Sequence, residues 1–297
     1  MTRIFALLAA LAVATTAAAQ EGTLKKIKDS GAITIGHRDA SVPFSYYDDK
    51  QQPVGYAMDI CAKVVDAVKG ELKLPNLKTN YQLVTSANRI PLMANGTIDL
   101  ECGSTTNNLA RQEQVWFATT HFVTANRFVS KKSAKIGKLA DLKGKTIVST
   151  AGTTNIKQIT ELNGEQKLGM NIISANGHAE AFQMVETGRA VAFVMDDILL
   201  YSLVAQSRSP KDYDISKEAL SVEPYGIMLR KDDAAFKKTV NGAINALYKS
   251  GEINKIYDKW FLKPIPPKNI NLNVPMSAPF KKVVANPTDS GDPAAYK

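Results

Sequence analysis

The sequence predicts an α/β fold with two lobes, each built on a mostly parallel sheet flanked by helices. A β-α-β-α-β order of apolar strand and amphipathic helix patterns occurs twice along the chain, and this order is typical of parallel sheets. The 297 residues also exceed the length of a typical single domain. Two α/β domains therefore account for the pattern.

The chain begins with a segment typical of a secretory signal. After Arg3, an apolar run covers residues 4–13, and small residues follow up to Ala19. This combination indicates an A-x-A cleavage site. A membrane anchor is the alternative, but the apolar run is shorter than the roughly 20 residues that a spanning helix requires. We therefore expect residues 1–19 to be removed from an exported protein.

Strand and helix signals define the first unit. Its first helix has apolar residues at helical spacing and Asp59 in the first turn, and its second helix is expected to begin at Ser86 and stop at Gly96. The unit comprises a strand at 31–36, a helix at 57–69, a strand at 81–84, a helix at 86–96 and a strand at 98–102.

The second unit repeats the same order further along the chain. A further apolar strand near residue 225 and two helical segments follow it, and the tail from Lys263 is rich in proline and asparagine. We expect this tail to wrap the surface or to be partly disordered. The second unit comprises a strand at 145–150, a helix that begins within 152–155, a strand at 171–174, a helix at 178–188 and a strand at 190–195.

Charge and cysteine content narrow the possible partners. The formal net charge of +9 favours anionic partners, but the lysines are scattered along the chain, so we expect no nucleic-acid partner. Cys61 and Cys102 are the only cysteines in the sequence. An exported protein permits a disulfide, yet spacing alone does not bring the two Cα atoms within roughly 7 Å. A disulfide and two buried free thiols both remain possible, and no metal site is indicated.

Three residues that can carry positive charge lie at a strand end or near a helix N-terminus, and these positions can indicate a binding site for anions. Arg38 directly follows the first strand, Arg89 lies three residues after Ser86, and His178 opens a helix. A cation near a helix N-terminus costs roughly 0.3 to 1 kcal/mol. A surface acid near Arg89 or a neutral capping role for His178 are the alternatives. Taken together, the three positions predict convergent anion binding.

The third strand of the first unit ends in a group of hydroxyl residues. Ser104 and Thr106 share one face of an extended segment, and Arg111 follows. A guanidinium binds a carboxylate through two parallel hydrogen bonds. The alternative for Arg111 is a solvated position on a helix. We interpret the strand end as a carboxylate clamp.

The second unit adds hydroxyl groups and one acid. Thr153 and Thr154 lie at a helix start, and the last strand ends in Asp196 and Asp197. Each of these residues is also a possible N-cap, but two adjacent acids are not both needed as the cap. One of them is therefore available to accept an ammonium group. Three arginines opposite Asp196 suit a ligand with two carboxylates and one amine, and no catalytic triad or acid pair is indicated.

These residues lie in segments that closely resemble the periplasmic amino-acid-binding proteins of ABC importers, specifically the glutamate/aspartate-binding branch. The resemblance covers essentially the whole chain after the leader. Its most specific segments are "GHRDASVPFSYYD", "TSANRIPLMANGTIDLECGSTTNNLARQ", "TGRAVAFVMDD" and "DKWFLKPIPPKN".

The resemblance implies a two-lobed periplasmic-binding-protein fold of type II, with the ligand in the cleft between the lobes. Lobe 1 is expected to comprise 22–125 and 223–297, and lobe 2 to comprise 126–222. It further implies a monomer without a cofactor that closes around its ligand and delivers it to a membrane permease. Ser104, Thr106, Arg111, Thr154 and Asp196 would hold the α-carboxylate and α-amine, and Arg38, Ser86, Arg89 and His178 the side-chain carboxylate.

Two other functions are compatible with the same scaffold. A periplasmic enzyme such as a cyclohexadienyl-type dehydratase needs a general acid, and the only obvious candidate is Asp196. A sensory carrier that docks a chemoreceptor or kinase would have a similar site. The sequence does not rank glutamate against aspartate, or exclude glutamine and other dicarboxylates.

Overall fold

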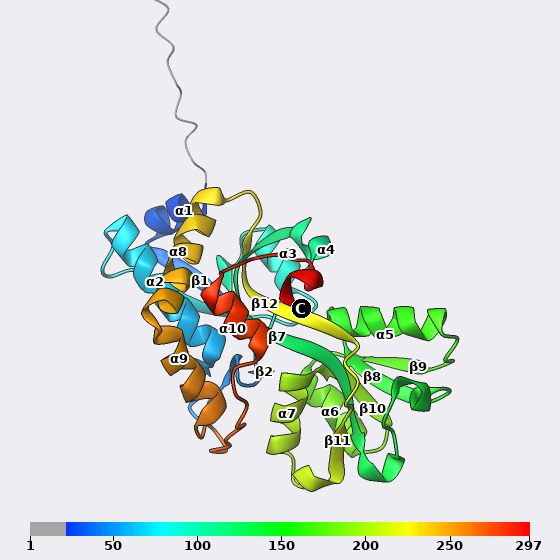
Figure 1. The fold of residues 1–297 in the computed structure, drawn as a ribbon. Coiled ribbons are helices and arrows are strands. Elements are labelled where there is room, and N and C mark those ends of the chain that lie inside the picture. The colour runs from blue at the N-terminus through cyan, green and yellow to red at the C-terminus, as the bar shows by residue number, and fades with distance from the viewer. Residues whose placement is uncertain (1–21) are drawn as a thin grey trace, which may run out of the picture.

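The computed structural model describes residues 22–297, so the expected leader, 1–19, lies outside the described residues. Figure 1 shows two α/β lobes, with two long strands running between them. No helix within 22–297 is long and apolar enough to span a membrane. The helices of the first lobe are α1 (Thr23–Ser30), α2 (Tyr56–Leu72), α3 (Arg89–Ala94), α4 (Leu109–Gln112), α8 (Ala234–Ser250), α9 (Glu252–Tyr257) and α10 (Ala278–Ala285), and those of the second are α5 (Thr154–Glu165), α6 (His178–Glu186) and α7 (Asp197–Gln206).

One continuous sheet connects the two lobes. The order is β5-β1-β6-β12-β7-β10-β8-β9, and β11 pairs with β7. A small separate sheet has the order β2-β3-β4. The strands are β1 (Ala32–His37), β2 (Ala40–Ser41), β3 (Ser45–Tyr47), β4 (Pro53–Val54), β5 (Lys78–Leu83), β6 (Leu100–Glu101), β7 (Val115–Lys131), β8 (Thr146–Thr150), β9 (Asn171–Ala175), β10 (Ala192–Asp196), β11 (Tyr213–Ile215) and β12 (Ser221–Arg230).

Each lobe has a parallel set of strands, as the sequence predicts. In the first lobe β1 pairs in parallel with β5 and β6, and in the second β8 pairs in parallel with β9 and β10. Their connections pass through helices that cover the sheet, which is the usual arrangement for parallel strands. The carboxyl ends of both sets face the region between the lobes, where ligands bind in such folds.

The two crossing strands, β7 and β12, form an antiparallel pair. Their pairing extends from Val115 opposite Arg230 to Asn126 opposite Ser221, with register shifts around Gly226. Beyond Asn126, β7 pairs with β10 and β11 of the second lobe. The strand predicted near residue 225 therefore crosses back to the first lobe and pairs there with β6. The boundary residues 125 and 223 remain a prediction.

Two local expectations need correction. The helix expected at 86–96 begins at Arg89, and Ser86 does not cap it. Instead, Thr85 and Asn88 cap each other, because the Thr85 backbone nitrogen donates to Asn88 at 2.7 Å and the Asn88 backbone nitrogen donates to Thr85 at 3.2 Å. This leaves the Ser86 hydroxyl available for another role. The strand expected at 98–102 is also shorter, because β6 comprises only Leu100–Glu101.

The cysteines, which the sequence left open, form a disulfide. Cys61 on the buried face of α2 bonds to Cys102, just after β6, and their Cα atoms are 6.3 Å apart. Both side chains belong to the main hydrophobic core, which contains residues of both lobes. The bond therefore ties α2 to the strand end that precedes Ser104.

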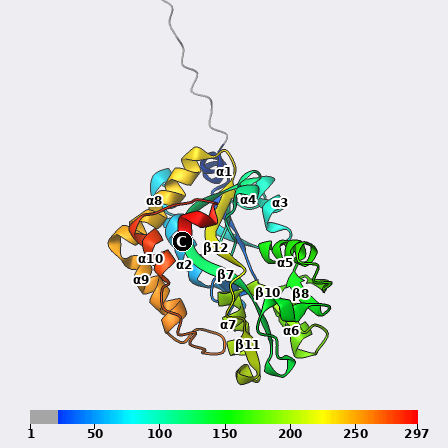
Figure 2. The same cartoon turned by 45° about the vertical axis from the view of Figure 1, so that its right-hand side comes forward.

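The C-terminal tail wraps the surface of the first lobe. It forms α10 and a short 3-10 helix, η5 (Pro293–Tyr296), and Phe280 and Tyr296 are buried. Figures 1 and 2 show the end of the chain beside β12 and β7. The first of the two expectations for this tail is therefore confirmed.

Candidate functional site

A small cavity lies where residues from both lobes meet. Its volume is about 10 Å³, roughly the room of one water molecule. The cavity in this structure therefore has no room for a larger ligand. Seven of the nine residues predicted for the site line this cavity, and Arg38 and Arg111 do not. The seven are Ser86, Arg89, Ser104, Thr106, Thr154, His178 and Asp196. Thr153, Asn155, Met195 and Leu199 complete the lining.

Two buried guanidinium groups lie on the first-lobe side. Arg38 is 1% and Arg89 is 2% exposed. Arg89 Nη1 donates to Thr105 Oγ1 at 2.6 Å, and Thr105 donates to Glu101 Oε2 at 2.5 Å. Within residues 22–297, Arg38 Nε and Nη1 and Arg89 Nε are buried without a hydrogen-bond partner. These donors are available to an anionic ligand.

Burial weakens the ionisation of both arginines without removing it. Loss of hydration lowers the pKa of Arg38 to about 10, with a further contribution from Arg89, while Glu101 opposes the shift. Burial likewise lowers the pKa of Arg89, again opposed by Glu101. At neutral pH the two guanidinium groups are therefore charged, and one buried glutamate lies near both.

Neutral polar groups from both lobes accompany these arginines. The hydroxyls of Ser86 and Ser104 have no hydrogen-bond partner within the described part of the chain. His178 opens α6, as predicted, and its Nδ1 lies 2.9 Å from Thr150 Oγ1. Burial, reinforced by Arg38 and Arg89, holds the pKa of His178 well below its ordinary value. Its imidazole is therefore neutral at physiological pH.

Arg111 connects the two lobes. It lies in α4, where the Asn108 side chain caps the helix by accepting from the Arg111 backbone nitrogen at 2.8 Å. Arg111 Nη1 donates to the Thr106 carbonyl at 2.8 Å, and Nη2 donates to the Gly152 carbonyl at 3.1 Å. Burial lowers the pKa of Arg111 to about 9. Only 8% of the side chain is exposed, which excludes the solvated alternative.

The two adjacent acids have different surroundings, and Asp196 makes no side-chain capping bond at the start of α7. Asp197 pairs with Arg127 at 3.1 Å and accepts from Thr124 at 2.5 Å. Asp196 instead lines the cavity and accepts hydrogen bonds from Asn155, at 2.7 Å, and from the Tyr225 hydroxyl. Of the two, only Asp196 lines the cavity.

The environment of Asp196 disfavours its charge. Burial, with a smaller contribution from Glu223, raises the pKa of Asp196 to about 7, although the hydrogen bonds from Tyr225 and Asn155 oppose the shift. An ammonium group at this position would restore the carboxylate form.

The two threonines at the start of α5 have different partners. Thr153 is the N-cap, because its hydroxyl accepts from the Ile156 backbone nitrogen at 3.2 Å. Thr154 donates to Glu223 Oε2 at 2.9 Å and approaches Thr106 Oγ1 at 3.5 Å. The threonine predicted for the site is thus not used as the cap.

Several residues around the cavity were not predicted from the sequence. Glu101 was included only as part of an apolar strand, although an acid within such a run is itself a signal of a buried charge partner. The missed residues are Glu101, Thr105, Asn155, Glu223 and Tyr225.

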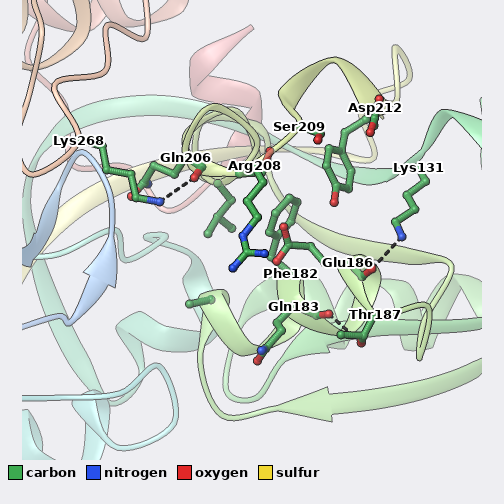
Figure 3. Close-up of a pocket in the computed structure, with 14 residues that line it drawn as sticks. Lys131, Phe182, Gln183, Glu186, Thr187, Gln206, Arg208, Ser209, Asp212 and Lys268 are labelled. Carbon is green, nitrogen blue, oxygen red and sulfur yellow. Dashed lines mark hydrogen bonds between the residues drawn. The ribbon is translucent and has the colours of Figure 1, made fainter.

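A larger groove of about 660 Å³ lies elsewhere, against α6, the end of α7 and β11. Figure 3 shows acidic and basic side chains along its walls, and Lys268 donates to the Gln206 carbonyl at 2.7 Å. Lys131 donates to the Glu186 carbonyl at 2.7 Å on another side. Its mixed charges do not converge as the buried donors of the smaller cavity do.

Two α/β lobes that meet at a buried set of anion-binding groups define a two-lobed ligand-binding protein. The chain belongs to the bacterial extracellular solute-binding proteins, family 3, which it matches over residues 33–263. It is 57% identical over 269 residues to an L-glutamate/L-aspartate-binding protein of Pseudomonas aeruginosa, covering 90% of this chain and 89% of that protein.

Other relatives support the same class. A glutamate/aspartate import solute-binding protein of Escherichia coli (strain K12) is 48% identical over 285 residues, covering 96% of this chain and 94% of that protein. The crystal structure of a cysteine-binding protein from Campylobacter jejuni matches with a TM-score of 0.72 at 25% identity, covering 85% of this chain and 97% of that chain. These relatives are named as binding proteins, which confirms the expected non-enzymatic role.

Proposed function

We propose that this protein is the periplasmic binding component of an ABC importer for acidic amino acids, L-glutamate or L-aspartate. The observation that carries the proposal is the pair of buried guanidinium groups, Arg38 and Arg89, which keep donors without a partner within the described residues. Arg89 lines the cavity that also presents Asp196. The names of the relatives that are about half identical support the same ligands and an import role.

The proposed ligand contacts fall into two groups. Ser104, Thr106, Arg111 and Thr154 bind the α-carboxylate, and Asp196 binds the α-ammonium. Arg38, Ser86, Arg89 and His178 bind the side-chain carboxylate. The unpartnered hydroxyls of Ser86 and Ser104 support this division, because a ligand carboxylate would satisfy donors that are otherwise costly to bury.

Closure of the lobes is the proposed mechanism of capture. Lobe 1, residues 22–125 and 223–297, and lobe 2, residues 126–222, rotate about β7 and β12 to enclose the ligand. The small volume of the cavity requires such a motion for entry. Exclusion of water strengthens each charge-assisted bond, and the closed monomer then delivers the ligand to a membrane permease.

Calorimetry against a panel of L-amino acids and dicarboxylates tests the ligand assignment. We expect tight binding of glutamate and aspartate and much weaker binding of neutral amino acids. Arg89→Ala should weaken glutamate binding at least tenfold, since loss of one partner of a buried charge pair costs about 2–5 kcal/mol, and should affect glutamine less. Arg111→Ala is the matched comparison, because it removes the α-carboxylate contact and should weaken both ligands.

Two outcomes would contradict the assignment. Tight binding of neutral amino acids together with indifference to glutamate and aspartate would remove the proposed role of Arg38, Arg89 and His178. Equal losses for glutamate and glutamine in Arg89→Ala would contradict the division between the two groups of contacts.

A further inference from the structure

The end of the chain, residues 288–297, contacts two segments that also serve the candidate site. We call this segment the C-terminal clasp. It lies beyond the residues matched to the family, which end at 263, and it contains η5. Figures 1 and 2 both show it beside β12.

The clasp holds the loop that carries Arg111. Asn107 is fully buried, and its side-chain nitrogen donates to the backbone oxygens of Asp289 at 2.8 Å and Ser290 at 3.2 Å. Gln112 donates to the same Asp289 oxygen at 3.2 Å and to Asn107 Oδ1 at 2.8 Å. Residues on both sides of Arg111 are therefore tied to the clasp and to each other.

Gly291 allows the clasp to approach the start of α4. A Cβ atom at this position would lie 2.8 Å from the backbone carbon of Asn108 and 2.9 Å from the backbone nitrogen of Leu109. Such contacts with backbone atoms are too short to persist, so even alanine would push the clasp and α4 apart. The two backbones are therefore packed as closely as a glycine permits.

A second set of contacts anchors the clasp to the body of the first lobe. The Thr120 backbone nitrogen, in β7, donates to the Thr288 carbonyl at 2.8 Å. The hydroxyls of Thr120 and Tyr296 lie 2.8 Å apart, and the buried Tyr296 also donates to the Ser290 carbonyl at 2.7 Å. Lys237 of α8 pairs with Asp289 at 2.5 Å. The clasp thus connects the Arg111 loop to a crossing strand and to a core helix.

We propose that the C-terminal clasp is a positioning element for Arg111, which holds its guanidinium ready for the α-carboxylate of the ligand. This inference rests on the proposed function, in which Arg111 binds that carboxylate. Arg111 Nη1 is fixed by the carbonyl of Thr106, the residue directly before Asn107. The clasp itself does not line the cavity, so it acts through the loop.

The clasp should increase ligand affinity because ordering a binding group during association costs conformational entropy. A loop already fixed in its binding geometry spends less conformational entropy on association. Without the clasp, the side-chain nitrogens of the buried Asn107 and the half-buried Gln112 lose acceptors, and a buried donor without a partner destabilises its surroundings. The loop would then rearrange, and Arg111 would move with it.

Truncation tests the proposal directly. A chain that ends at Pro287 should bind glutamate and aspartate at least tenfold more weakly than the full chain by calorimetry. The loss should be equal for both ligands, because both present the same α-carboxylate. Circular dichroism and thermal unfolding would establish that the truncated chain is folded. Unchanged affinity in a folded truncated chain would overturn the proposal.

A point variant decides the question if the truncated chain does not fold. Gly291→Ala should weaken both ligands severalfold, because its methyl group meets the backbone of α4. Gly242→Ala is the matched control, since nothing lies within 4 Å of a Cβ at that position in α8. Equal affinities for these two variants would reject the clasp as a positioning element.

A double-mutant cycle separates positioning from general stabilisation. In an Arg111→Lys background, disruption of the clasp by Gly291→Ala should cost much less affinity than in the wild type, because the group that it positions is gone. An equal loss in both backgrounds would indicate a merely structural role and overturn the inference. Failure of the full chain to bind any acidic amino acid would instead reject the proposed function, and the same cycle would then be measured with the amino acid that binds.

Discussion

Arg38 and Arg89 are close enough for the charge of Arg89 to lower the pKa of Arg38. In the part of the chain that the structure describes, the side-chain hydrogen bond of Arg89 goes to a threonine hydroxyl, not to a carboxylate. A buried charge without a well-matched partner is strongly destabilising. A ligand carboxylate would supply that partner. Arg38 and Arg89 would therefore destabilise the closed protein without ligand and stabilise the closed protein with ligand.

Asp196 gives the prediction that belongs to a single residue. A carboxylate must be ionised to accept an ammonium group, and burial raises the pKa of Asp196 to about 7. Below that pH the group is protonated, so binding then requires loss of a proton. Glutamate affinity should therefore fall about tenfold between pH 8 and pH 6. His178 does not contribute over this range, because its pKa is held well below the ordinary value.

Calorimetry of glutamate binding at several pH values measures this dependence. Repeating it in buffers of different ionisation enthalpy reports the proton released from Asp196. Asp196→Asn serves as the control, since an amide has no proton to lose, and its weaker binding should be flat over the same range. Affinity of the wild type that is constant from pH 6 to pH 8 would contradict the prediction.

Single residues also show where sequence reasoning succeeds. Arg38, Arg89 and His178 were predictable because they follow strand ends or open helices, positions that the order of elements alone brings together. Tyr225 was not predictable, although its strand was. Its contact with Asp196 depends on the register between β12 and β7, which shifts beside it. Roles in ligand binding remain predictions for all of these residues.

Among the elements, α2 is joined to the segment directly after β6 by the disulfide between Cys61 and Cys102. The bond closes a loop with a sequence separation of 41 residues. Loop-closure entropy predicts a stabilisation of about 4 kcal/mol for a loop of that length. The next residue, Gly103, packs against the buried Glu101 side chain, because a Cβ there would lie 2.4 Å from Glu101 Oε1. The strand end that leads to Ser104 is thus fixed on both sides.

The double variant Cys61→Ala, Cys102→Ala tests the value of this bond. Its free energy of unfolding in urea should fall by about 4 kcal/mol at 25 °C, chiefly because the unfolded chain regains freedom. The wild type in the presence of reductant provides the comparison. A change below about 1 kcal/mol in both cases would show that core packing around α2, and not the cross-link, sets the stability of this region.

The longest strand, β7, was missed as an element. Nearly all of Val115–Lys131 is buried, including Thr119, Thr120 and His121, so no alternation of apolar and polar residues marks it. The strands and helices of the two β-α-β-α-β units were predicted because each buries one face and has clear ends. The C-terminal clasp has no periodicity, so only its contacts in three dimensions reveal it.

For the whole molecule, closure depends on contacts between segments of different lobes. Arg111 donates to the Gly152 carbonyl, and Thr154 approaches Thr106. On another side, Lys268 of the C-terminal tail donates to the Gln206 carbonyl at the end of α7. These contacts are polar, whereas β7 and β12 are continuous strands. In the proposed opening motion, the polar contacts break and the two strands bend.

Gly152 packs closely against the backbone of Ser86 and Ala87. Its φ is +72°, and a Cβ there would lie 2.5 Å from the Cα of Ala87. Gly152→Ala should therefore prevent full closure and weaken glutamate binding at least tenfold. Small-angle scattering should show that the glutamate-saturated variant keeps a larger radius of gyration than the saturated wild type. The physical reason is a collision between backbones, which no side-chain rotation relieves.

Gly188→Ala provides the matched control for this experiment. Gly188 has a similar φ of +76°, but nothing lies within 4 Å of a Cβ at that position. Both variants should lose about 1 kcal/mol of stability from alanine at positive φ. Only Gly152→Ala should also lose affinity and compaction. If both variants close and bind like the wild type, the contact between Ala87 and Gly152 does not limit closure, and the proposed hinge motion would need a different end point.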